Sequence, residues 1–110
     1  MAKGKMYIPE DLPDLVDLLV SMRLNAPKLK DHTGYMPFIN LDYRFRQLNE
    51  GLASNRKKLG EERYQKLVQM SDQMRALFEA DPDSKTGDTA QGRRIIQEML
   101  EIVEQARRKA

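Results

Sequence analysis

Residues 61–80 read EERYQKLVQMSDQMRALFEA, and this stretch decides the fold. Its apolar side chains recur at intervals of three, four and three residues, at Leu67, Met70, Met74 and Leu77. Because an α-helix turns by about 100° per residue, these side chains fall on one side of a helix, whereas the alternation of a strand would scatter them. No glycine or proline interrupts the stretch, so helix propensity agrees with the spacing. We therefore expect one amphipathic helix over 61–80.

Three further segments carry an apolar stripe of the same period. They predict helices over residues 12–25, 41–59 and 89–108. Asn40 precedes the second of these helices and is a favoured N-cap residue. Gly51 lies inside the same helix, where glycine costs about 1 kcal/mol relative to alanine. We therefore expect either a bend at Gly51 or a neighbour that approaches the backbone closely.

The predicted elements define the fold class. Four amphipathic helices, none of which can bury its stripe alone, predict an all-α, four-helix bundle-like domain. A length of 110 residues suits a single domain over residues 1–110. Residues 1–8 are expected to be disordered unless they dock on the core. A long irregular loop over residues 26–39 connects the first and second helices.

The last predicted helix has an unusually broad apolar surface. Its apolar residues cover more of the circumference than the stripe of about 100° that faces one neighbour. Such a helix contacts either two neighbours in the same chain, or one neighbour and a second copy of the protein. For the second alternative, Leu100 and Ile102 are the candidate contact residues of a homodimer.

Composition bounds the class of protein. The chain has no cysteine, which excludes disulfides and thiolate chemistry and favours a reducing compartment. Lys3 and Lys5 are followed by the polar run IPEDLPD, so no signal peptide is readable. No apolar run approaches the roughly 20 residues of a membrane span. We expect a cytoplasmic protein that has no membrane partner.

The usual signatures of catalysis and metal binding are missing from the sequence. His32 is the only histidine, and without cysteine it cannot complete a zinc site except with carboxylates. Counted as a calcium loop from Asp81, the chain has Thr86 where the glycine is required and Gly92 where the glutamate is required. No serine stands in a GxSxG motif. We therefore expect a non-enzymatic protein with no catalytic residue, no metal site and no cofactor.

The predicted loop over 26–39 reads APKLKDHTGYMPFI and is longer than most loops in compact domains. Its apolar residues either plug the end of the bundle or bind a partner. The leading hypothesis is a small protein-interaction module (an adaptor, an inhibitor, or an antitoxin- or immunity-like partner) that acts by occupying another protein's surface. The candidate partner-binding residues are His32, Tyr35, Met36 and Phe38.

A basic stretch over residues 44–66 supports an alternative function, which is nucleic-acid binding. Its candidate residues are Arg44, Arg46, Arg56, Lys57, Lys58, Arg63 and Lys66. The same stretch also contains Glu50, Glu61 and Glu62, and the whole chain has a net charge of only +2. Three roles therefore stay open for the basic side chains: a solvated face, a site for an acidic protein, and a nucleic-acid site.

Overall fold

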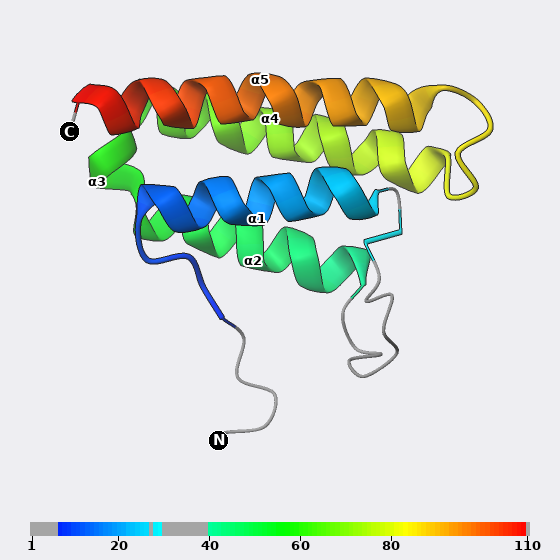
Figure 1. Cartoon of the computed structure of the whole chain (residues 1–110), viewed down its shortest axis with the longest axis horizontal. Helices are drawn as coiled ribbons and strands as arrows, with labels where there is room; N and C mark the ends of the chain where they lie inside the picture. Colours follow the sequence, from blue (N-terminus) through cyan, green and yellow to red (C-terminus); the bar gives the residue numbers. More distant parts are fainter. Residues whose placement is uncertain (1–6, 27, 30–39, 110) are drawn as a thin grey trace.

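The computed structural model describes residues 7–26, 28–29 and 40–109, and these residues form five helices (Figure 1). The helices are α1 (Leu12–Asn25), α2 (Leu41–Ser54), α3 (Arg56–Leu59), α4 (Glu61–Ala80) and α5 (Asp88–Lys109). Because the described residues contain no strand, the prediction of an all-helical chain is confirmed for this part. None of the described helices has the length and apolar character needed to cross a membrane.

Each of the four long helices packs against two of the other three long helices. α1 and α4 each contact both α2 and α5. Figure 1 shows neighbours in this ring running in opposite directions. The ring encloses one cluster of buried apolar side chains, which includes Leu15, Leu19, Phe45, Leu48, Met74, Phe78, Ile96 and Val103.

The broad apolar surface of α5 is used within the chain. α5 packs against α1 and α4, and also against the short helix α3. Ile96, Met99 and Val103 are fully buried there. Of the two explanations that the sequence left open, contact with two neighbours in the same chain therefore accounts for the breadth of this surface.

The helix predicted over residues 41–59 is divided at Asn55. The Asn55 backbone leaves the helical region, with φ −104° and ψ 13°, and its side-chain Nδ2 donates to the Gly51 carbonyl at 2.8 Å. Asparagine side chains compete in this way with the backbone bonds of a helix. The four-residue helix α3 follows and ends at Leu59, and its C-cap is Gly60, whose φ of +86° lies in the region that favours glycine. The prediction of one continuous helix is wrong at this point.

Gly51 lies where residues before α1 approach α2 closely. A Cβ atom added to Gly51 would lie 3.0 Å from both Cδ and Cγ of Pro9 and 3.1 Å from Cδ2 of Leu15. Contacts this short are tighter than ordinary packing allows, so a side chain would push these neighbours away. The close neighbour, one of the two explanations expected from the sequence, is therefore the reason for glycine here.

The turn between α4 and α5 is organised by the carboxylate of Asp81, which is only 2% exposed. Its Oδ1 accepts the backbone N–H groups of Lys85 and Thr86 at 2.6 and 3.1 Å, and its Oδ2 accepts that of Thr89 at 3.1 Å. The carboxylate thus occupies the anion-binding end of α5. Burial alone would raise the pKa of Asp81, but the bonds from Lys85, Thr86 and Thr89 outweigh it and lower this pKa to about 2.

We expect an Asp81→Asn variant to be less stable than the wild type at neutral pH, and the difference to shrink in acid. Folding lowers the pKa of Asp81 from 3.8 to about 2. The ionised carboxylate therefore contributes its full stabilisation above pH 3.8, and this stabilisation is lost as the pH falls towards 2. Urea unfolding of both proteins across this pH range measures the difference.

The matched control is Asp83→Asn in the same turn. Asp83 is exposed and lies 3.8 Å from Lys28, and exposed ion pairs contribute little to stability. This variant should remain close to the wild type in stability throughout. A deficit of Asp81→Asn that stays constant from neutral pH down to pH 2 would contradict the expectation.

Candidate functional site

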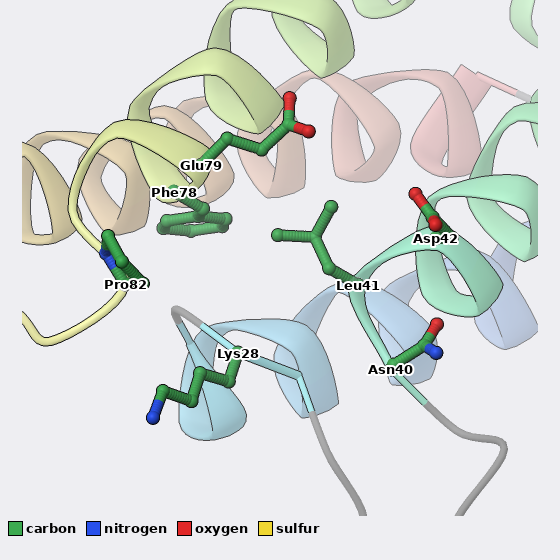
Figure 2. A pocket seen from close by; sticks show the side chains of 7 residues that line it. All are labelled: Lys28, Asn40, Leu41, Asp42, Phe78, Glu79 and Pro82. Carbon is green, nitrogen blue, oxygen red and sulfur yellow. The ribbon is translucent and has the colours of Figure 1, made fainter.

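An open hollow of about 430 Å³ lies where α2 begins and α4 ends (Figure 2). We call it the α2–α4 hollow. It is lined by Lys28, Asn40, Leu41, Asp42, Phe78, Glu79 and Pro82. Figure 2 shows the side chains of Leu41 and Phe78 extending towards one another, while the amino group of Lys28 points away from them. The hollow therefore has an apolar floor and polar groups around its edge.

The floor is supplied by the start of α2 and the end of α4. The Asn40 side chain accepts the N–H of Tyr43 at 3.0 Å and caps the first turn of α2, which fixes Leu41 at the edge of the core. Phe78 is 1% exposed, and its ring centroid lies 6.4 Å from that of Phe45. Leu41 and Phe78 are thus held in place by a helix cap and by core packing.

Charges on the edge are paired with one another. The Arg75 guanidinium contacts Asp42, lies 3.5 Å from Glu79, and sits 5.6 Å from the centre of the Phe45 ring. Arg75 therefore links α4 to α2 across the hollow's edge. With Lys28, the edge carries two cations and two carboxylates, so its charges balance.

The predicted partner-binding residues His32, Tyr35, Met36 and Phe38 lie outside the described residues. The described residues on either side of segment 30–39 are informative, because Lys28 and Asn40 both line the hollow. The segment that carries the candidate partner-binding residues is therefore attached to the described chain at this end of the molecule.

The basic residues of the alternative site fall into two groups. Arg44 and Arg46 are on the first half of α2, whereas the other five are on α3 and the first turns of α4. Arg44 donates to Gln47 at 3.0 Å, and Arg46 lies 3.8 Å from Glu50. The predicted stretch is thus not one continuous patch along a single helix.

The second group surrounds the joint between α3 and α4. Arg56 makes two hydrogen bonds to Glu61, of 2.7 and 2.6 Å, and its guanidinium lies 4.5 Å from the centre of the Tyr64 ring. The hydrogen bond from Arg56, followed by that from Gln65, lowers the pKa of Glu61 to about 2. The Arg56 charge is therefore engaged within the protein.

Three other cations of this group differ in their contacts. Lys58 donates to the Glu10 carbonyl at 3.4 Å, and Arg63 donates to the Leu59 carbonyl at 3.1 Å. Lys57 is an exposed side chain of α3. Carbonyl partners do not neutralise a cation, so these residues keep their charge at the surface.

A second hollow, of about 470 Å³, lies between the α3–α4 joint and α5. It is lined by Leu59, Gly60, Glu61, Glu62, Arg63, Lys66, Ile102 and Gln105. It thus brings two residues of the basic stretch together with Ile102, one of the two candidate self-association residues. The other candidate, Leu100, is 9% exposed and belongs to the core. Self-association stays a prediction, and Ile102 is the member of the pair that lines a surface hollow.

Sequence reasoning missed several residues that shape the α2–α4 hollow and its end of the core. Leu29 is fully buried although it stands in the segment predicted as an irregular loop. Arg75 has Glu79 at the helical spacing of four residues, a signal that was readable. Its second partner, Asp42, comes from another helix, and no local pattern could have identified that contact.

Neither metal-binding geometry nor similarity to known proteins assigns a function. In the part of the chain that the structure describes, no three His, Asp or Glu side chains come together as potential metal ligands. Comparisons with protein-family models, with curated proteins and with solved structures found no match. A functional proposal must therefore begin from the surface geometry.

Proposed function

We propose that this protein is a small non-enzymatic interaction module, such as an adaptor, an inhibitor or an immunity-like partner, that occupies the surface of another protein. One observation supports the proposal most strongly. The α2–α4 hollow has an ordered apolar floor, and Lys28 and Asn40 on its edge border the segment that carries the candidate anchors. Four long helices in a bundle-like arrangement serve as the scaffold that presents this end.

The proposed mechanism is steric. An apolar side chain of the partner enters between Leu41 and Phe78, and Tyr35, Met36 and Phe38 add contacts around it. Large apolar and aromatic anchors that fill ordered pockets carry most of the energy in such interfaces. The edge of the hollow carries charges of both signs, so it favours a partner with complementary charges beside the inserted side chain, because complementary charge speeds encounter and fixes orientation.

Site-specific photo-cross-linking tests the proposal. A photoreactive amino acid replaces Lys28 or Glu79 at the hollow, and replaces Lys57 on α3 as the control; all three positions are exposed. The full-length variants are irradiated in extract of the source cell. We expect the same discrete protein adduct from both hollow positions and none from position 57.

A loop variant makes the test specific for the predicted anchors. Tyr35→Ala, Met36→Ala and Phe38→Ala are combined in the chain that carries the cross-linker at Glu79. Because hot-spot side chains contribute 2 kcal/mol or more each and 1.4 kcal/mol is tenfold, we expect the adduct to fall by at least about tenfold. An undiminished adduct, or equal adducts from the hollow and from position 57, would contradict the proposal.

Nucleic-acid binding through residues 44–66 is the alternative function and makes an opposite prediction. Binding that neutralises phosphates weakens steeply as salt rises. If that alternative holds, a gel shift with any duplex disappears between low and physiological salt and is weakened by Lys57→Glu with Lys66→Glu. If the protein is instead a protein-interaction module, the wild-type protein should cause no gel shift with a duplex.

The proposal also includes a location and an oligomeric state. We propose a cytoplasmic protein, because a chain without cysteine needs no oxidising compartment. We propose a homodimer whose interface includes the hollow that Ile102 lines on α5. Sedimentation at high micromolar concentration distinguishes the mass of a dimer from that of a monomer. The Ile102→Asp variant should sediment as a monomer.

A further inference from the structure

Residues 7–10, which we call the N-terminal strap, precede α1 (Figure 1) and lie against α2. α2 and its C-cap hold the strap through its main chain. Gln47 Nε2 donates to the Tyr7 carbonyl at 2.8 Å, and Asn55 Nδ2 donates to the Pro9 carbonyl at 3.2 Å. The two carbonyls belong to alternate residues of the strap, so both hydrogen bonds are made to its backbone.

The surface beneath the strap is a row along one side of α2. Gln47, Gly51 and Asn55 stand at four-residue intervals, which places them on the same face. Gln47 is 4% exposed and Asn55 is fully buried, although both side chains are polar. Gly51 leaves the space that the Pro9 ring enters. We call this row the α2 strip. It consists of a notch at Gly51 and, on either side of the notch, a side-chain amide that binds the backbone of the strap.

One hydrogen-bonding group of the α2 strip has no partner. Asn55 Oδ1 is buried, and no residue of the described chain donates to it. Buried acceptors of this kind are uncommon in folded proteins. The opposite end of the same carboxamide is fully used, because Nδ2 donates to both Pro9 and Gly51. The α2 strip therefore holds a buried acceptor without a donor, beside an amide nitrogen whose two donors are both used.

Residue 9 of the strap, whose carbonyl binds Asn55, is a proline. In an extended segment, the N–H and C=O groups of one residue face the same edge. A carboxamide has one donor group and one acceptor, so it can bind both groups of that residue. At the position where Asn55 binds the carbonyl, the chain has Pro9, which has no N–H. The strap thus fills the α2 strip incompletely.

We propose that the α2 strip is a binding site for an extended segment of a partner protein, and that the strap is its built-in competitor. The ligand is a segment whose backbone N–H replaces Pro9 opposite Asn55, with a small side chain in the Gly51 notch. A second copy of this protein does not fit the requirement, because its strap would bring the same proline. The site is separate from the α2–α4 hollow and does not depend on the function proposed for it.

Competition between strap and ligand sets the conditions of the test. A tethered competitor acts at an effective concentration in the millimolar range, so the strap must be released before weak ligands are detected. Pro9→Asp does this without changing the α2 strip, because a carboxylate in the buried notch is unfavourable. Circular dichroism verifies that the full-length variant keeps its helix content.

Two short peptides probe the released strip. They are acetyl-Tyr-Ile-Ala-Glu-amide and the same peptide with N-methylalanine at the third position, which lacks the N–H. We expect the Pro9→Asp protein to bind the first peptide about fivefold more tightly, the ratio given by one net hydrogen bond of about 1 kcal/mol. The wild type should bind both more weakly. Equal affinities, or no binding to a folded Pro9→Asp protein, would overturn the proposal.

Amide hydrogen exchange in the intact chain tests the proposal independently. This test does not depend on whether the Pro9→Asp variant folds. Pro9→Ala installs an N–H at position 9 while keeping the strap. We expect this amide to exchange at least about tenfold more slowly than in an unstructured peptide, because Asn55 Oδ1 accepts it. Exchange at the unstructured rate would show that the orphan acceptor does not face a ligand's backbone, and the proposal would be wrong.

Discussion

Phe78→Ala will lower the free energy of unfolding by about 3–5 kcal/mol, the range measured for buried phenylalanines. Phe78 is 1% exposed and packs against Phe45 from α2. It also lies against the backbone of α5, since a Cβ added to Gly92 would be 2.4 Å from its Cε1 atom. Removing the ring therefore leaves a cavity where three helices meet. Urea unfolding followed by circular dichroism measures the loss.

Gly92→Ala tests whether the ring really occupies the space beside α5. Alanine has a helix propensity about 1 kcal/mol more favourable than glycine, whereas overpacking against a buried ring costs typically 1–3 kcal/mol. We expect a net loss of stability in the wild type. In a Phe78→Leu background the same substitution should be neutral or stabilising. A gain of stability from Gly92→Ala alone would contradict the packing.

The second large effect is expected at Leu29. This side chain is fully buried in the core, so Leu29→Ala should cost about 2–5 kcal/mol. Its backbone has a φ of 57°, a left-handed conformation that costs an L-residue roughly 1–2 kcal/mol and glycine almost nothing. We therefore expect Leu29→Gly to be at least as stable as Leu29→Ala. The measurement is again urea unfolding.

The control is the same pair of substitutions at Leu24, which is 71% exposed in α1. There the usual helical order applies, and the glycine variant should be less stable than the alanine variant. The two sites thus predict opposite orders for the same chemical change. If glycine is also the worse residue at position 29, the left-handed backbone at Leu29 is wrong.

The helices were predictable because the information that specifies them is local. In α4, Leu67, Met70 and Met74 recur at helical spacing and are buried, so periodicity alone identified the face that packs on the core. Gly60 was readable as a boundary because glycine tolerates the positive φ that the chain adopts there. The breadth of the apolar surface on α5 likewise indicated that more than one neighbour was needed.

What the sequence could not supply depends on contacts between distant residues. The α2–α4 hollow joins Leu41 to Phe78, and nothing in either local pattern indicates that they face each other. The break at Asn55 was missed because the apolar stripe continues through it to Leu59. Leu29 does not belong to a series of apolar residues at helical spacing, so its burial could not be predicted from the sequence. The roles of His32 to Phe38 stay predictions, since these residues lie outside the described chain.

The contacts of α5 set the order in which assembly can proceed. α4 and α5 are separated by only the residues of one turn, whereas α1 and α5, which also pack together, are far apart in the chain. Bringing distant segments together costs more chain entropy, and such contacts slow folding. We therefore expect the α4–α5 hairpin to form early in folding. The docking of α1 onto α5 is the long-range step that limits the folding rate.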